Sequence, residues 1–279
     1  MQINNKLIGE SLAFTPDKKN MLVRTEEIGD LTEIDAYCAD IKEYITIDDA
    51  IWDQEVEEGI LLSEWMYSGS GEGSEDDRAR IQEFINRNSV GTRVSPADAK
   101  EVKVSLGEYE DAVDNERQYI QKRRDILASI SSVEEYREFM DSCFRNSCFA
   151  DNILSEMKYI EKFSSHTQEI TDCLGLLNDE ALKLYEEHRD NLKEAMAILT
   201  AKQIACSPDH AHRDSLIFPF TYYEEIEGEK CSVQKEIMCE PHLKLINKHS
   251  NLRIYFYWKD DQVGEGRKVL VGRIGRHPY

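Results

Sequence analysis

Leu252-Arg-Ile-Tyr-Phe-Tyr-Trp258 is the stretch that decides the fold class of this 279-residue chain. Polar or amphipathic residues occupy the odd positions 253, 255 and 257, and isoleucine, phenylalanine and tryptophan occupy the even positions. A period of two residues is that of a β-strand with one buried face. The stretch therefore predicts a strand with arginine and tyrosines on one side and an apolar surface on the other.

Further strand signals flank this stretch. Residues 216–223 are rich in aromatic and β-branched side chains, Gly228 indicates a turn, and residues 231–239 alternate. Residues 259–267 carry two glycines and indicate a hairpin loop, after which Lys268–Ile274 forms the return strand. The C-terminal part of the chain is thus predicted to be a meander of three to five antiparallel strands.

Upstream of residue 208 the apolar period lengthens to three and four residues, as on one face of a helix. Ser132 and Glu135 form a capping box that starts one of these helices. We predict helices beginning near residue 30 and covering about 109–130, 151–163, 166–177 and 179–203, with residues 92–108 as a connector.

The expected fold class is α+β, an acidic and mainly helical N-terminal region followed by a small antiparallel β-sheet domain. We expect residues 1–108 to be helical with short N-terminal strands and residues 109–207 to form a helical bundle. Residues 208–279 would be the sheet domain with a basic C-terminal tail. Whether the first two regions form one domain or two stays open.

The charge is unevenly distributed along the chain. The net charge is −21, yet residues 241–279 hold 8 Lys and Arg against 3 Asp and Glu. A polyanionic ligand would be repelled by the acidic part of the chain and tolerated only by this tail. The acidic helices are by themselves typical of a solvated surface.

The sequence also indicates the compartment. Seven cysteines without a C-x-x-C pair suggest free thiols in a reducing environment. Residues 1–14 lack the pattern of a secretory signal, and no stretch approaches the length of a membrane span. We expect a cytoplasmic protein without a membrane partner.

The last forty residues bring together the groups needed to cleave a phosphodiester without a metal ion. RNA cleavage requires a base for the 2′-hydroxyl, an acid for the leaving oxygen and cations for the phosphorane. An aromatic ring at the rim can stack on a base. The alternative is that these side chains form ordinary cross-strand pairs. The candidates are Glu240, His242, Lys244, Arg253, Tyr255, Arg273, Arg276, His277 and Tyr279.

The order of three segments in this tail resembles the RelE/YoeB-type mRNA interferase toxins. The segments are Glu240-Pro-His-Leu-Lys244, Arg253-Ile-Tyr-Phe256 and Arg276-His-Pro-Tyr279. The family runs from a Glu-Pro-Leu-Lys segment through an Arg-Leu-Val-Tyr strand to a closing Arg-Tyr-His-Tyr. The resemblance implies a small antiparallel sheet flanked by helices that cleaves messenger RNA, usually on the ribosome.

The resemblance also implies roles for individual residues. Glu240 would be the base, Lys244 and Arg253 would hold the phosphate, and His277 would be the acid. Arg276 would be a further cation and Tyr279 a stacking or terminal group. We add His242, Arg273 and Tyr255 as expected nucleic-acid contacts, and we expect no cofactor.

A metal site is a weaker candidate. His210, His212 and Asp214 have the donor types of a zinc or manganese site. They partly echo the His-x-His-x-Asp-His run of metallo-β-lactamase-like hydrolases, but Ser215 stands where the last histidine belongs. A solvated loop after Pro208 is the preferred interpretation.

Two functions follow as hypotheses. The first is a metal-independent ribonuclease effector of the toxin or phage-defence kind, acting on RNA or the ribosome. Its acidic helical region would regulate it or bind a protein partner. The alternative is a non-catalytic interaction or adaptor subunit of a larger defence complex, in which the basic sheet is a docking surface.

Overall fold

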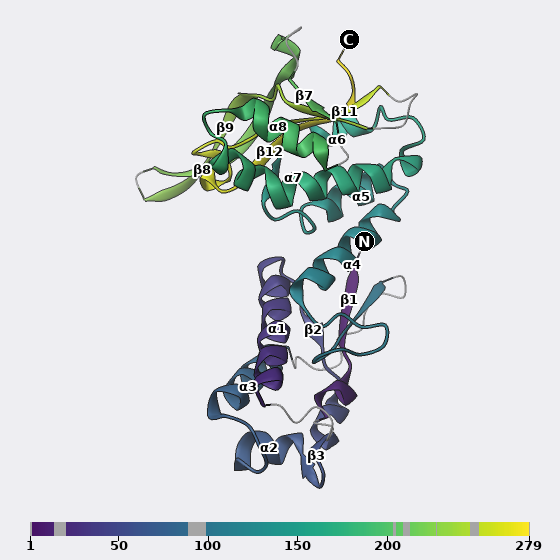
Figure 1. Cartoon of the computed structure of the whole chain (residues 1–279), viewed down its shortest axis with the longest axis vertical. Coiled ribbons are helices and arrows are strands. Elements are labelled where there is room, and N and C mark those ends of the chain that lie inside the picture. Colours follow the sequence, from purple (N-terminus) through teal and green to yellow (C-terminus); the bar gives the residue numbers. More distant parts are fainter. Residues whose placement is uncertain are drawn as a thin grey trace. The chain divides into compact units, whose positions relative to one another are not determined.

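The computed structural model describes residues 2–13, 21–88, 99–202, 205–208, 213–226, 228–245 and 251–278 (Figure 1). The chain divides into two compact units, Met1–Arg123 and Arg124–Tyr279. The division falls inside helix α4, Glu116–Ala128, and so differs from the boundaries near 108 and 207 that composition indicated.

Helices and several small sheets, some of them antiparallel, make up the chain, as the sequence led us to expect. The expected order, helical region first and sheet domain second, is not confirmed. A parallel sheet lies within the first unit, and the second unit contains helices as well as strands.

The first unit is built on a three-stranded parallel sheet with the order β2-β1-β5. Its strands are β1 (Ile3–Leu7), β2 (Ile45–Thr46) and β5 (Lys100–Val104). Strand β5 falls in the stretch predicted as a connector, of which residues 92–98 lie outside the described residues. Parallel strands are paired through crossovers, so no local turn in the sequence reveals them.

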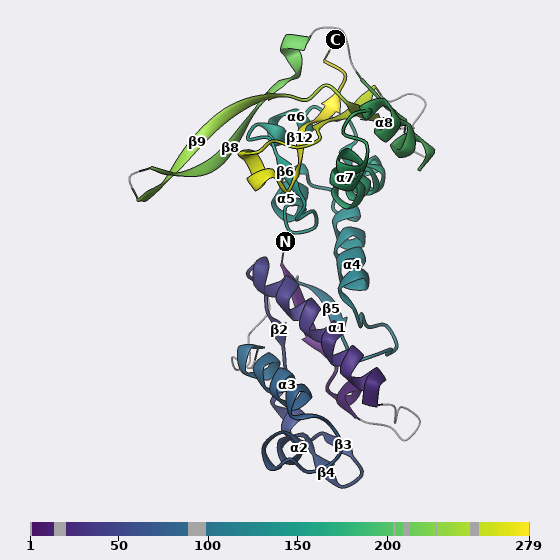
Figure 2. The same ribbon diagram turned by 60° about the vertical axis from the view of Figure 1, so that its left-hand side comes forward.

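Helices and a short hairpin complete the first unit. Helix α1 covers one face of the sheet (Figure 2). The further elements are α2 and α3 and the hairpin strands β3 and β4. Their bounds are α1 (Met21–Asp40), β3 (Glu55–Glu57), β4 (Ile60–Leu61), α2 (Leu62–Ser68) and α3 (Glu75–Asn88).

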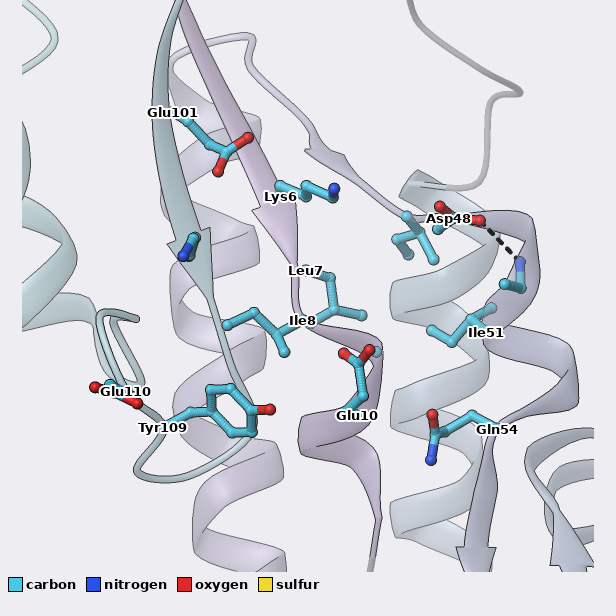
Figure 3. A pocket seen from close by; sticks show the side chains of 14 residues that line it. Lys6, Leu7, Ile8, Glu10, Asp48, Ile51, Gln54, Glu101, Tyr109 and Glu110 are labelled. Carbon is cyan, nitrogen blue, oxygen red and sulfur yellow. Dashed lines mark hydrogen bonds between the residues drawn. The ribbon is translucent and has the colours of Figure 1, made fainter.

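The carboxyl ends of β1, β2 and β5 lead into loops that surround a cavity of about 350 Å³ (Figure 3). The loop after β1 contributes Ile8, Gly9 and Glu10, and the chain after β5 contributes Tyr109. On the far side, the short 3₁₀ helix Asp49–Asp53 is capped by Asp48, whose side chain accepts a hydrogen bond from the Ala50 amide.

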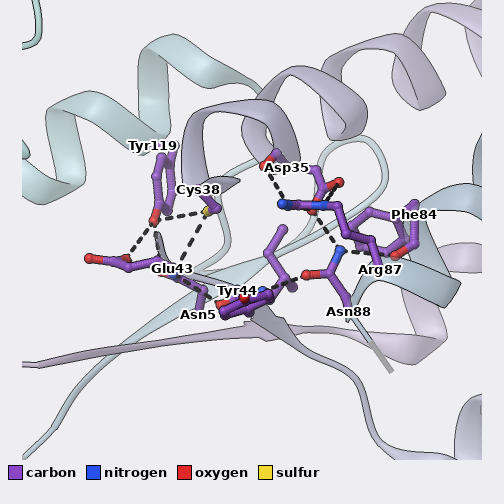
Figure 4. Close-up of polar contacts among 10 residues, drawn as sticks. Asn5, Asp35, Cys38, Glu43, Tyr44, Phe84, Arg87, Asn88 and Tyr119 are labelled. Carbon is purple, nitrogen blue, oxygen red and sulfur yellow. Dashed lines mark hydrogen bonds and ion pairs between the residues drawn. The ribbon is translucent and has the colours of Figure 1, made fainter. Parts of the chain in front are cut away.

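A buried polar network holds α1, β1 and α4 together in the first unit (Figure 4). The Tyr119 hydroxyl donates to Asn5 Oδ1 at 2.9 Å, and Asn5 Nδ2 donates to Glu43 Oε2 at 3.0 Å. The buried Arg123 guanidinium donates two bonds to the Glu43 carboxylate, at 2.6 and 2.9 Å. The Cys38 thiol donates to the Tyr119 hydroxyl. Burial of the thiol raises the pKa of Cys38 to about 12.

A second polar group joins α1 and α3 to the start of β2. The Asp35 carboxylate accepts hydrogen bonds from Arg87 and from Asn88 Nδ2. Asn88 Oδ1 in turn accepts from the Ile45 amide at 2.9 Å. These bonds satisfy polar groups that would be costly to bury alone.

The second unit contains a five-stranded sheet with the order β6-β12-β11-β10-β7. Strand β6 runs parallel to β12, and the remaining pairs are antiparallel. A separate hairpin is formed by β8 and β9. The bounds are β6 (Ser147–Phe149), β7 (Cys206–Ser207), β8 (Ile217–Ile226), β9 (Glu229–Met238), β10 (His242–Lys244), β11 (Leu252–Tyr257) and β12 (Val269–Arg276).

Helices α5 to α8 belong to the second unit. They are α5 (Val133–Met140), α6 (Ile153–Met157), α7 (Thr167–Glu187) and α8 (Leu192–Ala201). Ser132 caps α5 by accepting a bond from the Glu135 amide, as the sequence predicted. The predicted break at residues 177–179 is absent, because α7 continues across it.

Replacing Arg123 by methionine tests the network of the first unit. The change keeps the apolar stem but leaves Glu43 without its guanidinium, and breaking a buried pair costs about 3 kcal/mol. Arg117, exposed on the same helix, is the matched control. We expect Arg123→Met to lower the free energy of unfolding in urea and Arg117→Met to leave it within about 0.5 kcal/mol. Equal stabilities of the two variants would contradict the assigned role.

Candidate nucleic-acid interface

The register of β10, β11 and β12 places most of the predicted site residues on one side of the sheet. His242 pairs with Tyr255, which pairs with Arg273 on the next strand. Lys244 pairs with Arg253. Residues directly opposite in paired strands, and residues two apart along one strand, share a face. We call His242, Lys244, Arg253, Tyr255 and Arg273 the cationic face.

The opposite side of these strands is apolar and packs against helices. Leu243, Ile254 and Ile274 pair with one another across the three strands and are fully buried. Trp258 stacks on Tyr185 of α7, with ring centroids 6.5 Å apart. The sheet therefore has the two faces, one polar and one apolar, that the alternation over residues 252–258 predicted.

A β-bulge at Gly272 sets where the cationic face ends. Tyr255 pairs with Arg273, whereas the next residue, Phe256, pairs with Val271, so Gly272 is the extra residue. A Cβ at Gly272 would lie 2.4 Å from Phe218 Cδ2 and 2.8 Å from Cys239 Sγ. The β8–β9 hairpin thus approaches the sheet at a point that only glycine permits.

Two histidines and a tyrosine meet on this face. The His242 and Tyr255 ring centroids are 5.0 Å apart, and the His277 ring lies 6.3 Å from each of them. Ser207 Oγ lies 3.2 Å from His242 Nε2, within hydrogen-bond distance. The His277 amide donates to the Asn251 carbonyl, which extends the pairing past β12. His277 is the more exposed histidine, since His242 is only 4 % exposed.

Tyr255 differs from the role expected for it. Its side chain is 0 % exposed and belongs to an apolar cluster with Phe218, Cys239 and Leu270. The ring is therefore not available to stack on a base. Periodicity predicted which face Tyr255 occupies but not that the β8–β9 hairpin covers that part of the face.

Three of the predicted charged residues form ion pairs, two of them with carboxylates of the same unit. Glu240 accepts a hydrogen bond from Arg213 at 3.1 Å. Glu156 of α6 lies 2.9 Å from Arg273, and Glu161 lies 2.6 Å from Arg276. Glu156 and Glu161 were not predicted as partners, because they lie more than a hundred residues before Arg273 and Arg276 in the chain.

Lys244 and Arg253 lie opposite each other on β10 and β11, and their positive charges are available to a ligand. Both are partly exposed, and among the described residues neither forms an ion pair. One Arg253 Nη donates only to the Leu252 carbonyl, at 2.8 Å. They form the accessible part of the cationic face, and His277 lies next to the face, against His242.

Tyr279, His210 and His212 lie outside the described residues, and Asp214 is exposed in the short helix Arg213–Leu216. Within the described part of the chain, no three His, Cys, Asp or Glu side chains are arranged to hold a metal ion.

Two thiols near the sheet, those of Cys206 and Cys239, have raised pKa values. All seven cysteines are free. Burial raises the pKa of Cys206, on the strand beside β10, to about 12 and raises that of Cys239 further. Thiolate is the reactive form, so these side chains stay protonated and inert near neutral pH.

Comparison with protein-family models, curated proteins and solved structures found no match for this chain. No helix in the described ranges is both long enough and apolar enough to span a membrane.

Replacing Gly272 by alanine tests the bulge. Overpacking against Phe218 and Cys239 costs about 1–3 kcal/mol, so urea unfolding should show a loss of this size. Gly29 in α1 is the control, because a Cβ there meets no atom within 4 Å. We expect Gly29→Ala to be neutral or stabilising. A Gly272→Ala variant as stable as the parent protein would refute the close approach.

Proposed function

We propose that the chain is a metal-independent ribonuclease effector of the toxin or phage-defence kind, whose cationic face binds RNA. The second unit would be the effector part, acting in the cytoplasm on RNA or on the ribosome. The acidic first unit would regulate it or bind a protein partner. The observation that carries the proposal is the alignment of Lys244 with Arg253 beside the paired histidines His242 and His277.

The two accessible cations would hold the scissile phosphate. Lys244 and Arg253 are opposite each other on neighbouring strands, so both can reach one phosphate group. Cations fixed at this point would stabilise the additional negative charge of a phosphorane. Arginine adds a planar donor set that matches phosphate oxygens.

Proton transfer would fall to the two histidines and to Glu240. His277, the more exposed histidine, is the proposed acid for the leaving 5′-oxygen. Behind it, His242 is held by Ser207 and Tyr255 and would orient the His277 ring. Glu240 is the proposed base for the 2′-hydroxyl, released from Arg213 when RNA binds.

The existing ion pairs are compatible with RNA binding where they are exposed. Arg276 and Glu161 are 53 % and 81 % exposed, and such surface pairs contribute about 0–1 kcal/mol. A phosphate can therefore take the place of Glu161. Arg273 and Glu156, at 17 % and 22 % exposed, form a more enclosed pair that would position α6 instead.

Cleavage of a fluorescent single-stranded RNA in EDTA tests the catalytic proposal. We expect the full chain to cleave RNA, and we expect His277→Ala to lower the rate about 100-fold or more by removing the acid. Arg253→Ala should cause a comparable loss through the transition-state charge. The controls His188→Ala and Arg189→Ala, at the end of α7, should keep the parental rate.

The assay is repeated on ribosomes carrying a messenger RNA, because the RelE/YoeB resemblance implies cleavage on the ribosome. Absence of chelator-resistant cleavage on both substrates would contradict the proposal. Equal losses in the control variants would show that the effect is not specific to the cationic face.

A non-catalytic interaction subunit is the second candidate. The pairing of Arg273 with Glu156 and of Arg276 with Glu161 favours it, since part of the positive charge is already neutralised within the unit. In that case the cationic face would hold a nucleic acid or an acidic protein without cleaving it.

Replacing Glu161 by glutamine removes the charge beside Arg276 and tests whether this carboxylate competes with RNA for Arg276. Glu161→Gln should tighten RNA binding about two- to fivefold in fluorescence anisotropy, because an exposed pair is worth less than about 1 kcal/mol. Glu187→Gln, exposed at the end of α7, is the charge-matched control. If both variants tighten binding equally, only net charge matters and competition at Arg276 is excluded.

A further inference from the structure

We propose that the cavity of the first unit is a binding site for a small zwitterion with an apolar body, such as a free α-amino acid. The cavity lies in the other unit from the cationic face, and its lining does not take part in the proposed RNA chemistry. The proposal therefore stands or falls independently of the ribonuclease.

The topology of the parallel sheet favours a ligand site at this cavity. The chain leaves central strand β1 towards β2 on one side, and β5 lies on the other side of β1. Ligands of open parallel sheets bind outside the carboxyl ends of the strands, where the strand order reverses. Here that position is the space after β1 and β5, and the cavity occupies it (Figure 3). Its volume of about 350 Å³ is within the range of small-molecule sites.

Two lysines supply a positive end. Lys6 on β1 and Lys103 on β5 both line the cavity and are direct partners in the parallel register. Neither forms an ion pair with any described residue. Like charges placed opposite each other on neighbouring strands repel. An anionic group bound between them would remove that repulsion.

A carboxylate beyond the strand end supplies the negative end. Glu10 follows β1, and its side chain has no ion pair or hydrogen bond within the described part of the first unit. In Figure 3, Ile8 and Tyr109 lie on one side of Glu10, and Ile51 and Gln54 lie on the other. By contrast, Asp48 is occupied as a helix cap, and Glu110 points away from the space.

The distribution of charge selects the ligand. Lys6 and Lys103 stand within the strands, where Glu101 of β5 also lines the cavity (Figure 3). Glu10 stands after the strand end, so a bound molecule meets two cations towards one end and a carboxylate at the other. Leu7, Ile8 and Ile51 provide apolar walls between them, and the Tyr109 ring is 45 % exposed and open to contact. The lining holds four carboxylates, Glu10, Asp48, Glu101 and Glu110, against two lysines, and this excess of negative charge disfavours a polyanionic nucleotide.

Titration of the full chain by saturation-transfer NMR tests the site. The probes are L-leucine, L-methionine and L-phenylalanine, with 2-phenylethylamine and 3-phenylpropionate as analogues of phenylalanine that lack one charged group. We expect at least one amino acid to bind, and phenylalanine, if it binds, to bind about tenfold more tightly than either analogue. One lost charge-assisted bond of about 1.4 kcal/mol corresponds to tenfold.

Three variants test which side chains bind the amino acid. Glu10→Gln should weaken amino-acid binding about tenfold by losing the ammonium contact, and Lys103→Gln should do the same at the carboxylate. Glu33→Gln, exposed on α1 and outside the cavity lining, should bind as the parent protein does. Circular dichroism melting checks that each variant is folded.

Three results would overturn the inference. They are no binding by any of the three amino acids, binding of one charged analogue as tight as that of phenylalanine, and unchanged affinity in folded Glu10→Gln and Lys103→Gln proteins.

Discussion

The antiparallel register of β10, β11 and β12 is the constraint on which the proposed function depends. It fixes His242, Lys244 and Arg253 on one side of the sheet and gives the other side to the apolar residues that pack on α7. A slip of one residue would exchange the two sets. The bulge at Gly272 shifts the register between β11 and β12 by one residue, and the absence of a side chain there leaves room for Phe218 and Cys239.

Local neutralisation explains how a chain of net charge −21 can present a cationic face. Glu156 and Glu161 already lie beside Arg273 and Arg276, while Lys244 and Arg253 keep their charge for a ligand. Exposed charges are screened over about 8 Å at physiological salt, so the acidic first unit need not cancel the face at close range. The cationic face is therefore suited to close contact with phosphate groups at a few positions, and less to long-range electrostatic attraction of RNA.

The sequence predicted part of the fold and part of the site. Alternation over residues 252–258 predicted β11 and its two faces, and the capping box predicted the start of α5. Strands β5 and β6 escaped notice because each joins its sheet through parallel, non-local pairing that leaves no turn signal. The burial of Tyr255 was missed for a related reason, since a separate hairpin covers it. The roles assigned to Glu240, Lys244, Arg253 and His277 stay predictions.

Photo-crosslinking of RNA to the full chain, followed by identification of the modified peptides, tests the central claim most directly. A single-stranded RNA containing 4-thiouridine would be bound at low salt and irradiated. The account predicts cross-links in the peptides that contain Lys244, Arg253 and His277. Cross-links confined to the first unit or to the helices that cover the apolar side of the sheet would contradict it.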